Sequence, residues 1–371
     1  MKKTILYILL LITGSNLNSQ QNSCYSGIFI NHGCTSFCLD NDGYAVFGAN
    51  YDNVKDHYDG LVIVNKRNVS KSFAQYDSPG QHVSWISKYG SVSFNFIASQ
   101  TSWTGMNESG LVIYSMRLEE GSKGPEPDTR SWILVNFWLQ YMLDNCSDIG
   151  EVIASDSTMR IYSSGRIPHY LVSDRYGNCA TIEFIDRKMV THSEGFLPVK
   201  VLANTSYDRS ISGWDSILML RKKGEPVHNR DGSSLGRFTR AADRITMYQQ
   251  TDTETAINIA FDILKEVSGQ TNWSIVFDTK NLQIHFKTII NSEKGMIDFK
   301  RLDFSCKTPV KMIDINENIS GDITDKLLDY SFNYHFNHAV SAANKYDLEM
   351  STEELVKYIR SVEGMPCLEI K

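Results

Sequence analysis

The chain has 371 residues, enough for one large domain or two ordinary ones. Hydrophobic residues make up 42% of it and charged residues 22%, which is the composition of a soluble globular protein. The net charge is -6, so neither a nucleic acid nor an anionic membrane surface is indicated as a partner.

The first 19 residues have the pattern of a secretory signal peptide. Met1 is followed by two lysines, an apolar run from Ile5 to Ile12 and a small, polar stretch that ends near Ser19. The apolar run is too short to span a membrane, so no stable membrane insertion is expected after cleavage. The sequence therefore predicts a secreted or periplasmic protein, with residues 1–19 as signal peptide and the polar residues 20–33 as a short propeptide.

A strand-rich region follows, from residue 34 to about residue 114. Its first two strands, Thr35–Leu39 and a strand ending in Phe47–Asp52, are joined by a turn of Asp, Asn and Gly and form a predicted hairpin. Three further strands are predicted between turns that contain glycine and asparagine: Leu61–Val64, Ser91–Ile97 and Gly110–Tyr114. A polar loop with two prolines, residues 119–129, either covers a pocket or only connects two elements.

Helical patterns then alternate with hairpins. The predicted helices are Trp132–Leu143, a second beginning at Ser147, and segments around Asp215–Arg221, Gly236–Tyr248 and Thr253–Glu266. The predicted hairpins pair His169–Val172 with Cys179–Ile185, and Trp273–Asp278 with Leu282–Phe286. Strands at both ends of the region with helices between them indicate an α+β layered fold over residues 34–303.

The last part of the chain, residues 304–371, has a different pattern. Two polar, amphipathic helices are predicted there, Leu327–Tyr346 and Thr352–Val362, so we expect a helical C-terminal extension. His335 and His338 on the first of these helices are expected at the surface, not as metal ligands.

The chain contains seven cysteines, and an odd number leaves at least one unpaired thiol in an exported protein. A reactive Cys34 would account for it; alternatively several cysteines are buried and reduced. The sequence has no Gly-rich phosphate loop, no His-Glu-x-x-His motif and no Cys-x-x-Cys motif, and no histidine is obviously placed to complete a metal site with Cys34 and Cys38. We therefore expect no cofactor and no metal.

Cys34 directly follows a glycine at the start of the first predicted strand. If the bond between Gly33 and Cys34 is cut, Cys34 carries both a thiol and a free α-amine. An α-amine has a pKa near about 7.7–8.0 and a thiol near about 8.5, so the amine can accept the thiol proton near neutral pH. This is the chemistry of a nucleophile activated by its own N-terminal amine; the alternative is a buried structural cysteine.

Three polar residues far along the chain could complete such a site. Asp52, after the second strand, could hold the α-amine in its charged form, or simply form a turn. Asn204, at a strand end, could donate to an oxyanion, or be a turn residue. Arg237, at the start of a helix, could lower the pKa of the Cys34 thiol and anchor the catalytic groups, or form a surface ion pair.

Six short motifs are spread from Cys34 to about Phe299. They are Cys34-Thr35-Ser36-Phe37, Phe47–Asp52, Gly105–Leu111, Leu202–Thr205, Gly236–Phe238 and Thr271–Ser274. In this order they resemble the choloylglycine hydrolase family, which holds bile salt hydrolases, penicillin V acylases and related linear amide C–N hydrolases, with penicillin acyltransferase-like proteins as neighbours. The resemblance implies an N-terminal-nucleophile fold, in which two antiparallel sheets stack face to face between helices in four αββα layers.

The resemblance also implies roles for individual residues. Cys34 would be the nucleophile and its own base, and Asp52 would hold the α-amine. Asn204 would supply the oxyanion hole, and Arg237 would complete the site.

The chain departs from the family pattern at two positions. Ala49 stands where the family usually has arginine in the Phe-Gly-Arg-Asn-x-Asp segment, so a positive charge near the thiol is missing. Arg117 stands where bile salt hydrolases have asparagine, in the strand after the Gly-Met-Asn-Glu turn. Arg117 could partly replace the missing charge and contribute to the substrate or oxyanion site, or it could be an unrelated surface residue.

The sequence thus predicts a self-processed cysteine amidase that cleaves a small-molecule N-acyl amide. Two alternatives remain: an acyltransferase of the penicillin acyltransferase-like type, and a degenerate, non-catalytic binding protein, which Ala49 favours. Aromatic residues at Phe94–Phe96 and Trp103 fit either an apolar acyl pocket or the core. The acyl group stays open, and a homo-oligomer is possible.

Overall fold

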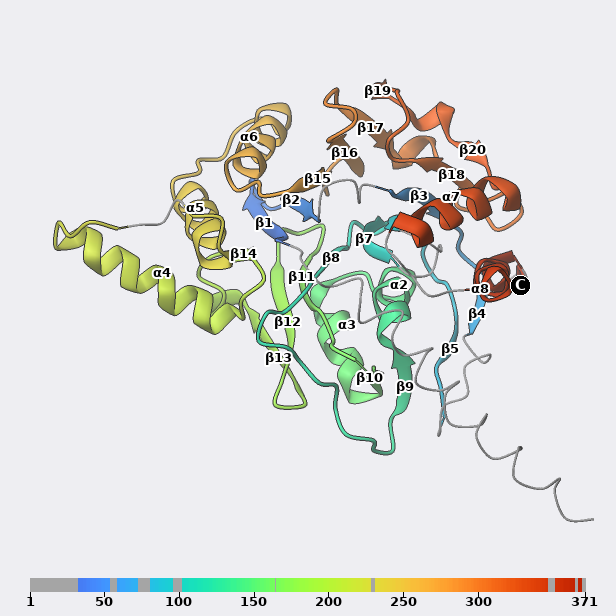
Figure 1. Ribbon diagram of the computed structural model, residues 1–371, viewed down its shortest axis with the longest axis horizontal. Helices are drawn as coiled ribbons and strands as arrows, with labels where there is room; N and C mark the ends of the chain where they lie inside the picture. Colours follow the sequence, from blue (N-terminus) through green and yellow to red (C-terminus); the bar gives the residue numbers. More distant parts are fainter. Residues whose placement is uncertain are drawn as a thin grey trace, which may run out of the picture.

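Two β-sheets stacked face to face form the centre of the protein (Figure 1). The computed structural model describes residues 33–53, 59–72, 81–95, 102–163, 165–227, 231–345, 351–363 and 366–368. The predicted signal peptide, and all of the predicted propeptide except Gly33, lie outside these residues.

The first sheet has seven strands in the order β14-β1-β2-β15-β16-β17-β19. They are β1 (Thr35–Asp40), β2 (Ala45–Asp52), β14 (Val201–Leu202), β15 (Thr271–Asp278), β16 (Gln283–Thr288), β17 (Gly295–Asp298) and β19 (Gly321–Asp322). The predicted β1–β2 hairpin is confirmed, with Thr35 opposite Asn50, and β15 pairs with the other side of β2. The strand that Cys34 precedes is therefore an inner strand with hydrogen-bonded neighbours on both sides.

The second sheet has nine strands in the order β13-β12-β11-β8-β7-β6-β3-β18-β20. They are β3 (Leu61–Asn65), β6 (Ser91–Asn95), β7 (Ser102–Asn107), β8 (Val112–Met116), β11 (His169–Ser173), β12 (Cys179–Ile185), β13 (Lys188–Ser193), β18 (Lys311–Asp314) and β20 (Leu328–Asp329). The predicted β11–β12 hairpin is confirmed, and β8 pairs with β11 near the middle of this sheet.

Helices cover the outer faces of both sheets (Figure 1). On the first sheet, α5 (Ser234–Thr246) packs against β1 and β14, α6 (Thr253–Glu266) packs against β2 and β15, and α4 (Tyr207–Lys222) packs against α5. On the second, α2 (Val135–Asn145) and α3 (Ile149–Ala154) contact β7, β8 and β12. Two small two-stranded sheets are separate from these, β4 (Ser70–Ser72) with β5 (Ser84–Ile86) and β9 (Ser131–Leu134) with β10 (Met159–Tyr162). The predicted four-layer αββα class is confirmed.

The main hydrophobic core lies between the two sheets and beneath α5 and α6. Every residue of β2 is buried, because a layer covers each face of the strand. Gly48 is required there, since a Cβ at this position would lie 2.5 Å from the ring of Phe37 on β1. The packing of Phe37 across Gly48 thus brings β1 and β2 together beside the Cys34 end of the hairpin.

The segment after residue 304 differs from the predicted helical extension. Its first part forms strands, because β18 pairs with β3 and β20 in the second sheet and β19 pairs with β17 in the first. Met312 and Ile313 are adjacent and both buried, on opposite faces of β18. A strand covered on both faces has neither helical nor alternating periodicity, which is why this strand was missed.

Two helices follow close to their predicted ranges, α7 (Phe332–Lys345) and α8 (Thr352–Glu363), and pack against each other. The expectation that His335 and His338 are surface residues is wrong, because both are buried. The Nδ1 atom of His338 lies 3.3 Å from a carboxylate oxygen of Asp314 on β18. The histidine face of α7 therefore packs onto the sheet.

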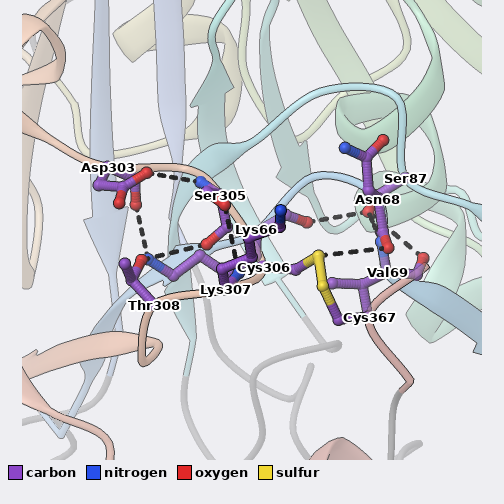
Figure 2. The surroundings of a disulfide bond; sticks show 10 residues. All are labelled: Lys66, Asn68, Val69, Ser87, Asp303, Ser305, Cys306, Lys307, Thr308 and Cys367. Carbon is purple, nitrogen blue, oxygen red and sulfur yellow. Dashed lines mark hydrogen bonds between the residues drawn. A yellow bond between two sulfur atoms is a disulfide. The ribbon is translucent and has the colours of Figure 1, made fainter. Parts of the chain in front are cut away.

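A disulfide between Cys306 and Cys367 connects the two ends of the C-terminal segment (Figure 2). Cys367 also forms a β-bridge with Val69, and the backbone N–H of Leu368 donates to the Asn68 carbonyl over 2.8 Å. The disulfide thus joins the end of the chain to the edge of the core. No helix among the described residues is long and apolar enough to cross a membrane.

Candidate active site

Cys34 lies immediately before β1 and is almost completely buried between the sheets. The preceding residue, Gly33, lies against two of the predicted site residues. A Cβ at Gly33 would be 3.1 Å from Nη1 of Arg237 and 3.3 Å from Oδ2 of Asp52. The Gly33–Cys34 peptide is therefore next to a carboxylate and a guanidinium contributed by distant segments.

Asp52 ends β2, and its carboxylate is held by the segment that leads into β15. Its Oδ2 accepts a hydrogen bond from the backbone N–H of Gly269 over 3.2 Å, and its Oδ1 accepts one from the Thr271 hydroxyl. Burial raises the pKa of Asp52 to about 6, although the bond from Thr271 and the charge of Arg237 act in the opposite direction. Asp52 is thus an oriented carboxylate that gains its charge within the physiological pH range.

The Cys34 thiol is protonated at neutral pH in the uncleaved chain. Burial, and then the charge of Asp52, raise the pKa of Cys34 to about 11. Hydrogen bonds to the Tyr114 hydroxyl and the Asp52 backbone N–H, and the charge of Arg237, lower the pKa in part. At pH 7 such a thiol is a thiolate in about one molecule in ten thousand, so attack by Cys34 needs a base.

Arg237 reaches the site from the first turn of α5, a helix capped by the Ser233 hydroxyl. Its guanidinium donates through Nε to Thr35 Oγ1 over 3.2 Å and through Nη2 to Asn204 Oδ1 over 2.6 Å. Nη2 also lies 3.5 Å from the Cys34 carbonyl oxygen, and Nη1 donates to the Gly232 carbonyl. The guanidinium is therefore fixed by several acceptors.

Asn204 follows β14 and is fully buried. Because its Oδ1 accepts from Arg237, the orientation of the side-chain amide is fixed, and Nδ2 donates to the Arg117 carbonyl over 2.9 Å. An amide nitrogen carries two hydrogens, so the second N–H of Nδ2 can serve another acceptor. The structure thus brings the backbone of Arg117 beside Asn204, whereas the role of the Arg117 side chain stays a prediction.

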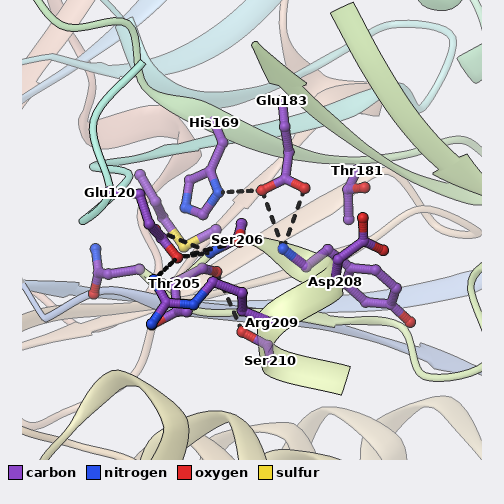
Figure 3. Close-up of polar contacts among 12 residues, drawn as sticks. Glu120, His169, Thr181, Glu183, Thr205, Ser206, Asp208, Arg209 and Ser210 are labelled. Carbon is purple, nitrogen blue, oxygen red and sulfur yellow. Dashed lines mark hydrogen bonds and ion pairs between the residues drawn. The ribbon is translucent and has the colours of Figure 1, made fainter. Parts of the chain in front are cut away.

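Polar side chains that no sequence motif indicated hold the segment after Asn204, the buried pair His169 and Glu183 on one side and the exposed Glu120 on the other (Figure 3). The Glu183 carboxylate on β12 accepts the backbone N–H of Tyr207 at the start of α4 over 3.2 Å, and His169 Nδ1 lies 3.0 Å from it. Residues 169 and 183 are directly opposite each other in the predicted hairpin, so the pairing of its two strands could have predicted this contact. On the other side, Glu120 accepts from the backbone N–H and hydroxyl of Ser206.

Tyr114 is a further site residue, and no sequence motif indicated it. It lies on β8 in the second sheet, and its buried hydroxyl crosses to the first sheet, where it donates to the Asn50 carbonyl over 2.6 Å. The same hydroxyl is a hydrogen-bond partner of the Cys34 thiol. Burial raises the pKa of Tyr114 well above its usual value, so the hydroxyl keeps its proton.

The loop of residues 119–129 lines a pocket, as one of its two predicted roles requires. A cavity of about 1280 Å³ lies between this loop, β10 and the end of β12, and it extends to Ser206, two residues after Asn204. Five basic side chains line it together with three acidic ones: Lys123, Arg160, Arg166, Arg187 and Arg209 with Glu120, Glu126 and Asp186.

Within the described residues, no group of three or more His, Cys, Asp or Glu side chains is arranged to hold a metal ion.

Two stacked sheets between helices, with a buried cysteine before an inner strand, define an N-terminal-nucleophile hydrolase fold. A profile of the "linear amide C–N hydrolases, choloylglycine hydrolase family" matches residues 34–242, and the chain belongs to this family. The protein is accordingly a hydrolase of C–N bonds in linear amides.

Individual relatives agree with this assignment. Penicillin V acylase from Pectobacterium atrosepticum is 27% identical over 276 residues, a match that covers 61% of this chain and 70% of the relative. The structure of penicillin V acylase from Agrobacterium tumefaciens is 24% identical and superimposes with a TM-score of 0.69 over 80% of this chain and 98% of that one. The structure of a variant of conjugated bile acid hydrolase from Clostridium perfringens is 18% identical and superimposes with a TM-score of 0.63 over 78% of this chain and 99% of that one. These structures share the fold.

Proposed function

We propose that Cys34 becomes the N-terminal residue by cleavage of the Gly33–Cys34 bond and is then the nucleophile of the amidase. One observation carries this proposal. Asp52 and Arg237, from distant parts of the chain, both lie against the Gly33–Cys34 peptide, and Asn204 is joined to them because its Oδ1 accepts a hydrogen bond from Arg237.

The high pKa of the uncleaved thiol explains why a free N-terminus matters. In the processed enzyme the α-amine of Cys34 accepts the thiol proton, directly or through one water, and the Asp52 carboxylate stabilises the ammonium that results. Before cleavage no α-amine exists at Cys34, and the Asp52 carboxylate beside Gly33 is the base we assign to the first attack of the thiol. Because this carboxylate loses its charge below about pH 6 in the uncleaved chain, we expect processing to slow as the pH falls through that value.

The reaction then proceeds in two halves. The Cys34 thiolate attacks the amide carbonyl carbon, and the oxyanion accepts hydrogen bonds from Asn204 Nδ2 and from a backbone N–H near Arg117. The C–N bond breaks as the ammonium of Cys34 gives its proton to the leaving nitrogen, which leaves an acyl-thioester. Water, deprotonated by the α-amine, attacks the thioester; the C–S bond breaks and the free acid leaves.

We also propose that the protein is exported. The two lysines after Met1 and the short apolar run support removal of residues 1–19, and cleavage after Gly33 removes the remaining residues 20–33. Export would present Cys34 to its substrate outside the cytosol.

Intact-mass measurement combined with product analysis tests the proposed function. Purified enzyme is expected to begin at Cys34 and to release a free acid and an amine from a panel of N-acyl amides. Penicillin V and conjugated bile acids are the first substrates to test, because the similar proteins are named after them as penicillin V acylase and conjugated bile acid hydrolase. An added amine acceptor separates the alternatives, since a transferase would form a new amide in its presence. A chain that keeps residue 33 and releases no acid from any substrate would contradict the proposal and favour a binding protein.

A further inference from the structure

Ala49, Cys34 and Tyr114 lie in the same buried layer between the two sheets. Side chains alternate along a strand, so Cys34 and Ala49 both point toward the second sheet. Both are completely buried in the cluster between the sheets, and Tyr114 from β8 belongs to the same cluster. Ala49 contributes only a methyl group to this layer, and Tyr114 extends into the layer from the opposite sheet.

The position of the Tyr114 hydroxyl is fixed by the first sheet. It donates over 2.6 Å to the carbonyl of Asn50, and Asn50 is paired with Thr35, the residue after Cys34. The hydroxyl is therefore one residue from the nucleophile along β1 and within hydrogen-bonding reach of its sulfur. Tyr114 as a whole is 1% exposed.

We propose that Tyr114 is a catalytic residue that donates a hydrogen bond to the Cys34 thiolate. The hydroxyl has one hydrogen, and it donates this hydrogen in a hydrogen bond to the Asn50 carbonyl while Cys34 is a neutral thiol. When the sulfur becomes negative, the O–H group rotates about the C–O bond and donates its hydrogen bond to the sulfur instead, because a charged acceptor forms the stronger hydrogen bond. No bond of Tyr114 is broken in this step.

Replacing Tyr114 by phenylalanine tests this role, which rests on the proposed function of Cys34. The rate of Cys34 alkylation by iodoacetamide is measured against pH in the processed enzyme. In Tyr114→Phe the profile is expected to move upward by about one to two pH units, the size of a lost hydrogen bond to a charged group. The value of kcat is expected to fall, with KM little changed.

Tyr170→Phe is the matched control. Tyr170 is equally buried, but it lies on β11 in the cluster beneath α2, and its hydroxyl has no partner among the described residues. Its alkylation profile is expected to coincide with that of the wild type. A Tyr114→Phe profile that also coincides would overturn the role of Tyr114 alone. A wild-type Cys34 that is neither processed nor alkylated would instead overturn the proposed function and this role with it.

A separate observation concerns two other cysteines. Cys38 on β1 and Cys179 at the start of β12 are 141 residues apart in the chain, yet their sulfur atoms are only 2.8 Å from each other. This is well inside the usual separation of non-bonded heavy atoms, about 3.5–4.0 Å. Both side chains are buried, and the two strands belong to different sheets.

We infer that Cys38 and Cys179 form a second disulfide, which links the two sheets four residues from the nucleophile. The two thiols lose two protons and two electrons as the S–S bond forms, and a disulfide donor, small or protein-bound, is cleaved to two thiols. The exchange takes place during folding, before the sheets close over both sulfurs. The number of free thiols among the described residues would then fall from four to two, those of Cys34 and Cys146.

Thiol counting and peptide mapping decide this point. Protein refolded with a glutathione redox buffer is denatured, alkylated without reductant and digested. A linked Cys38–Cys179 peptide is expected, and reduction is expected to lower the melting temperature of a Cys306→Ser/Cys367→Ser variant, in which no other disulfide is present. The same variant with Cys38→Ala and Cys179→Ala is the control, and its melting temperature should not respond to reductant. Recovery of Cys38 and Cys179 as separate alkylated peptides would overturn the inference.

Discussion

Replacing Cys34 by alanine is expected to abolish amide hydrolysis, with kcat reduced by roughly 10⁴- to 10⁶-fold, the scale seen when other enzymes lose their nucleophile. The reason is that Cys34 supplies both the attacking sulfur and, after processing, the amine that moves its proton. The same change should stop cleavage of the Gly33–Cys34 bond. Turnover is measured on an amide substrate, and processing by intact mass.

Cys146→Ala is a suitable control for this experiment. Cys146 is also a buried free cysteine, but it lies at the end of α2, and burial raises its pKa to about 12. It should therefore neither react nor affect turnover. Cys34→Ser distinguishes processing from catalysis, because a hydroxyl can still attack the preceding peptide slowly. A Cys34→Ala enzyme with wild-type turnover would rule out the proposed mechanism.

Replacing Asn204 by alanine is expected to lower kcat by about 10²- to 10³-fold, the usual effect of losing one oxyanion donor. The Nδ2 atom of Asn204 has one N–H committed to the Arg117 carbonyl, and Arg237 fixes the amide in the orientation that leaves the second N–H for the substrate. Because this N–H meets negative charge only after attack, KM should change little. Steady-state kinetics over a range of substrate concentrations separate the two constants.

The alkylation rate of Cys34 provides an internal check on this prediction. This rate measures the reactivity of the thiol, and alkylation forms no oxyanion. It should therefore stay within a few-fold of the wild-type rate in Asn204→Ala. Asn41→Ala is the matched control, since Asn41 is equally buried and donates to the Thr251 carbonyl over 2.9 Å at the far end of the β1–β2 hairpin. Asn41→Ala is expected to lose stability and keep its turnover per folded molecule. Equal losses of kcat in both variants would mean that Asn204 acts only through the fold.

Local patterns in the sequence were sufficient for much of the fold. The hairpins around residues 40–43, 174–178 and 279–281 were predicted because turn residues separate strands whose length and composition are clear. The helix Thr253–Glu266 has its predicted bounds, since Asp252 caps its first turn through the Thr255 N–H. Elements of this kind are specified by neighbours within a few residues. The strand β18 was missed because burial on both faces removes its periodicity. The exposed strands β19 and β20 have two residues each, too few for any periodic pattern.

The sequence by itself determined that Cys34 follows a glycine before a strand, and that Asp52, Asn204 and Arg237 stand in family motifs. Only the tertiary structure decided that Asp52 and Arg237 meet beside the Gly33–Cys34 peptide and that Asn204 is bonded to Arg237 there. The bond from Arg237 to Asn204 and the reach of Tyr114 from one sheet to the other depend on how the sheets and α5 pack. Periodicity is a property of a single element, whereas the partner of a buried polar group is chosen by three-dimensional packing. The environment of the Cys34 thiol was therefore visible only after the layers had been assembled.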